Sequence, residues 1–150
     1  MLMGTRYRGT KEEVRALDAY INLMRAAELV TTRIHRHLSA VNLTISQFGV
    51  LEALFHLGPL SQRDIAQKLL KSGGNITMVI DNLEKRQLVK RERSADDRRF
   101  VSVCLTDEGR QLISEIFPRH VPVVVEEMSI LTESEQEELG RLGLRLGKKA

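Results

Sequence analysis

Apolar residues recur at steps of three and four along the first part of the chain, between residues 11 and 41. The pattern includes Val14, Ile21, Leu38 and Val41. This spacing places the apolar side chains on one face of a helix. It predicts one long amphipathic helix over this range.

A second helix is marked at both ends by its sequence. Thr44 and Gln47 have the spacing of a capping box, in which each side chain bonds to the backbone of the other residue. The apolar run that follows reaches Leu57, and Gly58 with Pro59 ends it.

Two more helices follow, joined by a short turn. Ser61 with Asp64 begins the third helix, which is expected to end near Lys71. We expect the turn at residues 71–74, and Ser72 to cap the fourth helix. The fourth helix has one apolar face, formed by Ile76, Val79, Ile80 and Leu83.

The last third of the chain combines a hairpin with two helices. Residues 88–93 and 100–105 flank a polar turn and predict a β-hairpin. Thr106 begins the next helix, which Pro118 and Pro122 are expected to kink or break. A final helix begins with the capping box of Thr132 and Glu135, carries Leu139, Leu142 and Leu146, and completes the chain.

The order of these elements predicts the fold class. Two helices joined by a tight turn and followed by a hairpin are typical of a winged helix-turn-helix. The class is mainly α with a small β-hairpin wing. The winged-helix region spans 43–105, and long helices lie at 11–41 and 106–147. No internal repeat or linker interrupts residues 1–150, so we expect one domain.

Composition narrows the class of protein. The 150 residues contain one cysteine, which excludes an intrachain disulfide framework, and their net charge is +3. No segment approaches the length of an apolar membrane span, and the N-terminus lacks the apolar core of a signal peptide. We therefore expect a soluble globular protein in the cytoplasm.

Charge is distributed unevenly along the chain. From Lys85 to Arg99 there are seven basic and three acidic residues, whereas Glu126 to Glu138 contains six glutamates and no basic residue. This asymmetry favours a nucleic-acid-binding face set apart from the rest of the molecule. In the alternative interpretation, the basic and the acidic segments are two ordinary solvent-exposed surfaces without a binding partner.

The fourth helix has the features of a recognition helix. Met78 suits contact with a thymine methyl, and Asn75 or Thr77 can bond to base edges or phosphates. Gly73 and Gly74 would let backbone amides approach a phosphate. In the alternative interpretation, Met78 packs on a neighbouring helix and the glycines only make a turn. The face opposite the apolar one presents Gly74, Thr77, Met78, Asp81 and Lys85, flanked by Asn75 and Asn82.

Four motifs resemble the MarR (multiple-antibiotic-resistance regulator) family of bacterial winged-helix transcription factors. They occur in family order and spacing across about residues 10 to 147. The motifs are Leu43-Thr44-Ile45-Ser46-Gln47-Phe48, Leu83-Glu84-Lys85-Arg86 with Leu88-Val89 and Arg91, Asp97-Arg98-Arg99, and Leu105-Thr106-Asp107-Glu108-Gly109.

The resemblance implies a homodimer, paired through the first and last two helices, that binds a pseudo-palindromic operator in double-stranded DNA. It implies that Arg99 enters the minor groove, that Asp97 orients Arg99, and that Arg98 lies near a phosphate. The expected DNA-contacting residues are Ser72, Gly74, Asn75, Thr77, Met78, Asn82, Lys85, Asp97, Arg98 and Arg99.

Two positions depart from the family pattern. Gln87 stands where glycine is usual, so this helix end must hold a non-glycine residue in a left-handed conformation, at a cost of roughly 1 kcal/mol, or be capped differently. Peroxide-sensing branches carry a reactive cysteine in the first helix, but the single cysteine here is Cys104, in the second strand of the hairpin. We expect an inert thiol, although the strand pattern does not determine its burial.

No catalytic motif is present, so no enzyme activity, cofactor or metal is expected. The chain lacks the nucleophile elbow, the paired zinc histidines and the phosphate loop. His35 and His37 point away from each other on a helix and cannot chelate one metal unaided. His56 and His120 appear isolated, and helix-end packing is the alternative to a ligand-pocket role for either.

The predicted function is a DNA-binding transcriptional regulator, most often a repressor in this family, released by a small ligand. An architectural winged-helix protein without an effector is the alternative. Segments 72–77 and 116–120 look most like those of branches that answer to quinones or phenolic compounds. The expected ligand pocket is lined by Arg36, Phe48, Leu51, Phe55, His56 and Ile113, which are mostly apolar with a few polar groups.

Overall fold

The computed structural model of the chain describes residues 4–148, which divide into two compact units. One unit is the continuous segment His37–Pro122, and the other is formed by the residues before and after it. In chain order the elements are α1 (Lys11–Ile34), η1 (His35–Val41), α2 (Ile45–Leu57), α3 (Gln62–Leu69), α4 (Gly73–Lys85), β1 (Val89–Arg93), β2 (Val101–Leu105), α5 (Asp107–Met128) and α6 (Glu133–Gly147).

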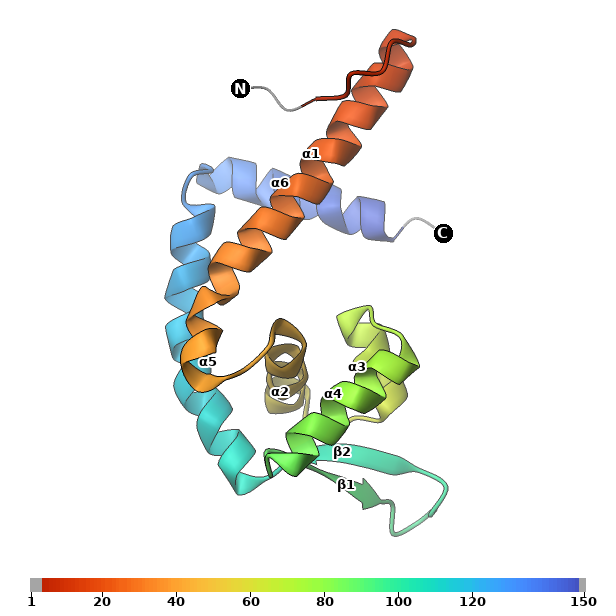
Figure 1. The fold of residues 1–150 in the computed structure, drawn as a ribbon, viewed down its shortest axis with the longest axis vertical. Helices are drawn as coiled ribbons and strands as arrows, with labels where there is room; N and C mark the ends of the chain where they lie inside the picture. The colour runs from red at the N-terminus through yellow and green to blue at the C-terminus, as the bar shows by residue number, and fades with distance from the viewer. Residues whose placement is uncertain (1–3, 149–150) are drawn as a thin grey trace. The chain divides into compact units, whose positions relative to one another are not determined.

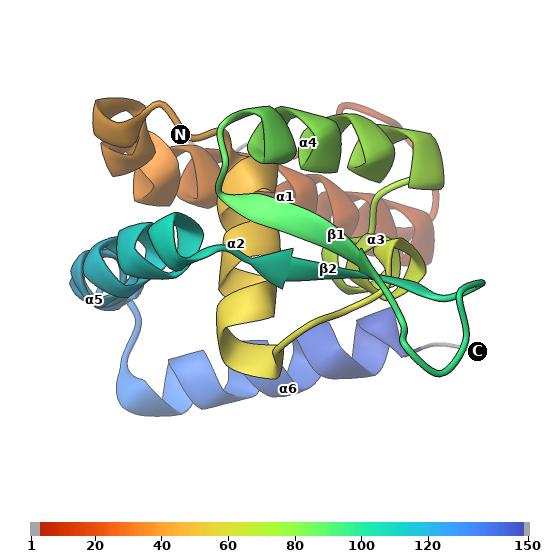
Figure 2. The same ribbon diagram turned by 90° about the horizontal axis from the view of Figure 1, so that it is seen from below.

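The unit His37–Pro122 is a winged helix-turn-helix, which confirms the predicted fold class. Helices α2, α3 and α4 pack together, and the hairpin lies alongside them (Figures 1 and 2). Strands β1 and β2 pair antiparallel, from Val89 opposite Leu105 to Arg93 opposite Val101. Leu60 exchanges both of its backbone hydrogen bonds with Val103, which joins the start of α3 to the hairpin.

One hydrophobic core holds this unit together, and every helix of the unit and the hairpin contribute to it. Its largest fully buried side chains include Phe48 and Leu51 from α2, Ile80 from α4 and Ile113 from α5. Because Ile80 lies on the predicted apolar face of α4, burial of that face orients the helix about its axis. The polar face of α4 is therefore turned to the surface.

Capping interactions begin the helices where the sequence predicts. In the capping box of α2, the Gln47 amide N–H donates to Thr44 Oγ1 over 3.1 Å and the Thr44 amide N–H donates to Gln47 Oε1 over 3.0 Å. Thr132 and Glu135 form the same pair at α6. Ser61 caps α3 with its hydroxyl oxygen.

The single helix predicted for residues 11–41 is wrong in its last two turns. The α-helix ends at Ile34, and His35–Val41 continues as the tighter 3₁₀ helix η1. A 3₁₀ helix has three residues per turn, so Leu38 and Val41 still share a face. A step of three residues also fits one face of an α-helix, so the apolar spacing over this short stretch could not separate the two helix types.

The turn between α3 and α4 lies at Leu70–Ser72 rather than at residues 71–74. Leu70 adopts the left-handed conformation, with φ of 56°. Ser72 caps α4 by accepting from the Asn75 amide, which places Gly73 in the first helical turn. The glycines therefore belong to α4 and not to the turn.

Helix α5 is continuous through both of its prolines, so the predicted break is wrong. A proline in a helix removes one hydrogen bond to the carbonyl four residues earlier. For Pro118 and Pro122 those carbonyls belong to Ser114 and to Pro118 itself. All three residues are exposed, so water can satisfy the freed oxygens.

Gln87 ends α4 in the left-handed conformation, with φ of 60°, which is the first of the two alternatives that the sequence left open. Its amide N–H donates to the Glu84 carbonyl over 2.9 Å, and the Leu88 N–H donates to the Leu83 carbonyl over 3.0 Å. These two bonds form a Schellman motif, in which glycine is the usual left-handed residue.

We expect the substitution Gln87→Gly to stabilise the protein by about 0.5 to 1 kcal/mol. Glycine removes the steric cost of the positive φ, and its greater freedom in the unfolded chain offsets part of the gain. Urea denaturation measures the change in the free energy of unfolding. Gln67→Gly, within the helical turns of α3, is the control and should destabilise the protein.

Candidate nucleic-acid interface

The exposed face of α4 carries the side chains that the sequence assigns to base contact. Ile76, Ile80 and Leu83 are buried, and Met78 on the opposite side is 66% exposed and so is not packed against a neighbouring helix. All of the residues predicted on this helix to contact DNA are exposed: Ser72, Gly74, Asn75, Thr77, Met78, Asn82 and Lys85.

The two glycines at the start of α4 are not required by the fold. A methyl group added to Gly73 or Gly74 would meet nothing within 4 Å, and neither residue has a positive φ. The space above the first turn of α4 is open, and the helix dipole there favours an anion. A nucleic-acid backbone can therefore approach this turn closely.

The tip of the wing presents an oriented arginine. Arg99 Nη2 donates to Asp97 Oδ2 over 2.7 Å, and Arg99 Nε and the Arg99 amide each donate to Asp97 Oδ1 over 3.0 Å. These hydrogen bonds lower the pKa of Asp97 and raise the pKa of Arg99. The Arg99 side chain is still 86% exposed, so it is held in one direction and open to a partner.

Backbone hydrogen bonds fix the rest of the wing tip. The Ser94 amide donates to the Phe100 carbonyl over 2.9 Å, and the Phe100 amide donates to the Asp97 carbonyl over 3.1 Å. Arg93 Nη1 donates to the Arg98 carbonyl over 2.7 Å. Arg98 and Phe100 project into solvent beside Arg99.

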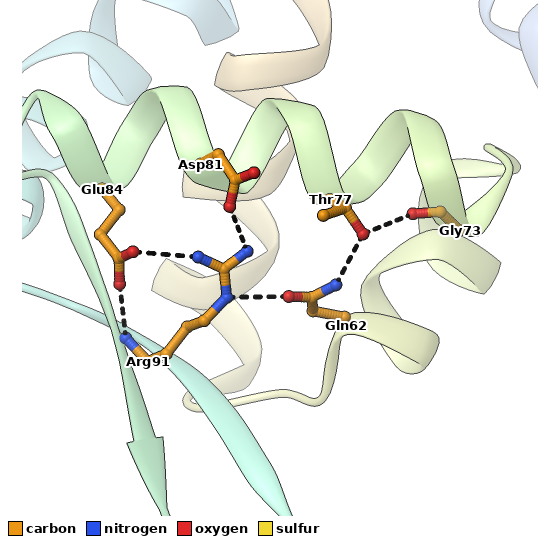
Figure 3. Close-up of polar contacts among 6 residues, drawn as sticks. All are labelled: Gln62, Gly73, Thr77, Asp81, Glu84 and Arg91. Atoms are coloured by element: carbon orange, nitrogen blue, oxygen red, sulfur yellow. Dashed lines mark hydrogen bonds and ion pairs between the residues drawn. The ribbon is translucent and has the colours of Figure 1, made fainter.

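A polar network centred on Arg91 joins the wing to α4 and α3 (Figure 3). Arg91 Nη2 pairs with Asp81 Oδ1 at 2.7 Å, and Nη1 pairs with Glu84 Oε1 at 3.0 Å. Arg91 Nε donates to Gln62 Oε1 over 2.9 Å, and Gln62 Nε2 donates to Thr77 Oγ1 over 3.1 Å. The sequence indicated Arg91 only as part of a motif, and no local pattern connects it with Gln62.

Arg86, from the same motif, has a structural role. Its Nη1 donates to the Asn42 carbonyl over 2.6 Å and its Nη2 to the Val41 carbonyl over 3.2 Å. These bonds attach the end of α4 to the turn before α2.

Cys104 lies half-buried on β2, with Sγ 3.7 Å from Glu92 Oε2. Burial raises the pKa of the thiol, and the negative charge of Glu92 raises it further. A thiol with a raised pKa forms little of the reactive thiolate at neutral pH. Its environment is that of an inert cysteine.

We expect Cys104 to react with iodoacetamide more slowly than a free cysteine at neutral pH, with the midpoint of its pH profile at higher pH. Glu92→Gln should speed the reaction because it removes the nearby charge. Mass spectrometry of the alkylated protein measures both rates, and a Cys104 that reacts faster than free cysteine would contradict the assignment.

Two histidines that lie far apart in the sequence come together in the structure. His37 Nε2 and His120 Nδ1 are 2.9 Å apart and hydrogen-bonded, and His120 is 8% exposed. The His120 ring lies against Phe48, with centroids 4.6 Å apart. His56 makes an edge contact with Phe117, with centroids 4.5 Å apart.

The residues expected to line a ligand pocket are placed at very different depths. Phe48, Leu51 and Ile113 are fully buried in the hydrophobic core, and Phe55 is half-buried. His56 and Arg36 are exposed. His56 also borders a cavity of about 320 Å³ between α2 and α3, together with Gly49, Glu52, Ala53, Leu57, Lys68 and Leu69.

Residues 4–148 contain no group of three or more histidine, cysteine, aspartate or glutamate side chains placed to hold a metal ion. Over the same range, no single helix is both long enough and apolar enough to cross a membrane.

Sequence comparison shows that this chain is similar to known transcriptional regulators. The model of the MarR family matches residues 43–101. The chain is 34% identical over 136 residues to the HTH-type transcriptional regulator MhqR of Bacillus subtilis (strain 168). That match covers 91% of this chain and 94% of MhqR.

Solved structures of similar fold cover almost the whole chain. One is BpsR of Bordetella bronchiseptica, whose DNA binding is regulated by 6-hydroxynicotinic acid, with a TM-score of 0.82, 24% identity, and coverage of 97% of this chain and 100% of that chain. Another is NadR in complex with 4-hydroxyphenylacetate, with a TM-score of 0.74, 26% identity, and coverage of 99% and 100%. At 24% identity, the similarity to BpsR shows the fold alone.

Proposed function

This chain belongs to the MarR family of DNA-binding transcriptional regulators, and from that premise we propose that it is a repressor released from its operator by a small aromatic ligand. The single observation that carries the DNA-binding part is the joint exposure of one face of α4 and of the oriented Arg99 on the wing. A helix of this kind enters the major groove, and an arginine on a wing reaches the adjacent minor groove.

We assign the contacts by the chemistry of each exposed side chain. Met78 contacts a thymine methyl, and Asn75 and Asn82 bond to base edges or phosphates. Lys85 and Arg98 neutralise phosphates, which contributes affinity without sequence preference. Ser72 and Gly74 place the first turn of α4 against the backbone.

The other compact unit supports a homodimer. Within it, α6 buries none of its residues, and large apolar side chains stay exposed on both α1 and α6. They include Tyr20 and Met24 on α1 and Leu144 and Leu146 on α6, each at least half exposed. A cavity of about 650 Å³ in this unit is lined mainly by apolar side chains, which include Leu23, Val30 and Leu139. A second copy of the chain would cover such a surface.

Light scattering should give a mass of about 34 kDa, twice the 17.0 kDa of one chain. The apolar surfaces of α1 and α6 are the reason for this expectation. A folded species of 17.0 kDa at micromolar concentration would contradict it.

The proposed effector is a phenolic or quinone-like compound. The cluster of Phe48, Phe55, His56, Phe117 and His120 supports an aromatic ligand, because rings that meet at tilted or edge-on angles, together with ring nitrogens, suit a flat molecule with polar substituents. The binding of 4-hydroxyphenylacetate by NadR supports the same class of compound.

Footprinting on the promoter of the protein's own gene tests the regulatory function. A regulator of this kind protects a discrete inverted repeat, with half-sites about one helical turn or a multiple of it apart. Addition of 4-hydroxyphenylacetate or a quinone should weaken that protection. Uniform weak protection without a repeat would favour an architectural DNA-binding protein instead.

A further inference from the structure

The hydrogen bonds of the Arg91 network have only one possible direction. A guanidinium group carries donors and no acceptor, so Gln62 must turn its carbonyl oxygen toward Arg91 Nε. The amide nitrogen of Gln62 therefore faces Thr77 and donates to Oγ1. The Thr77 hydroxyl must then donate its single hydrogen to the Gly73 carbonyl, 2.9 Å away, because that oxygen can only accept.

This direction leaves Thr77 with no donor for DNA. Its hydrogen is used inside α4, and one lone pair is used by Gln62, so what remains at the surface is an acceptor. Thr77 is exposed and lies on the side of α4 that faces α3 (Figure 3).

Asp81, one turn further along α4, offers the same chemistry. Its Oδ1 accepts from Arg91, and Oδ2 accepts no hydrogen bond from the described residues. Glu84 differs, because its Oε1 accepts from Arg91 Nη1 and its Oε2 from the Arg91 amide. Arg91 also offsets the charge of both acids, which would otherwise repel the phosphates of a bound duplex.

We propose that Thr77 and Asp81 determine operator specificity by selecting bases that present an exocyclic amino group in the major groove. Resting on the proposed function, this inference names the part of the operator that one flank of α4 recognises. In the major groove, the donors available to an acceptor are adenine N6 and cytosine N4, whereas guanine and thymine present oxygen. Arg91 and Gln62 act as positioning residues, because they set the direction of the hydrogen bonds.

The test compares base preferences of the full-length wild-type protein with those of two variants. Duplexes bound from a random pool are sequenced for the wild type, Asp81→Asn and Thr77→Val. The wild type should enrich adenine or cytosine at the two positions that these residues contact. Asp81→Asn keeps an oxygen for Arg91 and turns an amide donor outward. At the operator position that residue 81 contacts, the base preference should therefore change toward guanine or thymine by about tenfold. Thr77→Val should lose preference at its position.

Asp107→Asn is the matched control, since it removes the same charge from an exposed acid on α5 and should leave all base preferences unchanged. On the enriched duplex, replacing the contacted adenine with purine, or cytosine with 2-pyrimidinone, deletes only the amino group. This deletion should weaken DNA binding by the wild type about tenfold. At the operator position that residue 81 contacts, it should not weaken DNA binding by the Asp81→Asn variant.

Two results would overturn the inference, and they have different meanings. An enriched inverted repeat whose base preferences are the same in wild type, Asp81→Asn and Thr77→Val would reject the acceptor assignment and leave the regulatory function intact. Failure of the wild type to enrich any repeat would reject the proposed function and this inference together.

Discussion

Gly109→Ala is expected to destabilise the protein by at least about 3 kcal/mol, the largest effect of any single methyl group that we predict. Gly109 is buried in the first turn of α5, and an added Cβ would overlap the carbonyl oxygen of Leu88. Backbone atoms cannot rotate aside as a flexible side chain can. The start of α5 would have to move away from the chain that leaves α4.

That movement would break the bonds that anchor α5. The Thr106 amide donates to the Leu88 carbonyl over 3.1 Å, and Thr106 Oγ1 donates to the Gln87 carbonyl over 2.6 Å. The Gly109 amide in turn donates to Thr106 Oγ1 over 3.0 Å. Losing this set is costly because Leu88 and Gly109 are buried, so water replaces the bonds of their backbone groups poorly.

Gly74→Ala is the matched control, measured in the same urea denaturation series. Its added methyl meets nothing within 4 Å, so stability should stay the same or rise by up to about 1 kcal/mol. The same variant should bind DNA more weakly if a phosphate approaches the first turn of α4. A Gly109→Ala protein within 1 kcal/mol of the wild type would show that α5 does not depend on this close contact.

Arg99→Ala should have the largest effect on DNA binding, a loss of about 10- to 100-fold in affinity for the operator. The charged group is 86% exposed and held in one direction by Asp97, so little side-chain freedom is lost when it enters a groove. A narrow A·T-rich minor groove concentrates negative potential. The loss should therefore be greatest for operators with A·T-rich flanks, as measured by fluorescence anisotropy on a set of duplexes.

Arg98→Ala is the control for charge alone. Arg98 is expected at a phosphate, so its loss should weaken binding to all duplexes similarly and reduce the salt slope by about one. If Arg98→Ala and Arg99→Ala changed affinity for all flanking sequences equally, the minor-groove role of Arg99 would be rejected.

The contribution of Arg99 should not depend on pH near neutrality. Hydrogen bonds from Arg99 lower the pKa of Asp97, so the carboxylate is ionised above its ordinary pKa and loses its charge only as the pH falls through the lowered value. The ratio of wild-type to Arg99→Ala affinity should therefore be constant between about pH 6 and pH 8.

The elements of the fold were predictable because their signals are local. The capping pair of Thr44 and Gln47 and the polar turn after Arg93 act through residues a few positions apart. The amphipathic pattern of α4 identified the buried Ile76 and Ile80, and with them the exposed face. Where the pattern was ambiguous, as at η1, the prediction was wrong because a step of three residues, such as that from Leu38 to Val41, keeps two side chains on one face in either helix type.

The sequence by itself determined the order of the elements and the exposed face of α4, since these follow from spacing along the chain. Tertiary structure alone decided which side chains from distant segments meet. His37 and His120 are separated by 83 residues, and Arg91 meets Gln62 across 29. The tertiary structure also decided that α5 continues through Pro122, because the energetic cost of a proline in a helix depends on whether water reaches the carbonyl that loses its hydrogen bond. Such contacts depend on three-dimensional packing and leave no periodic signal in the sequence.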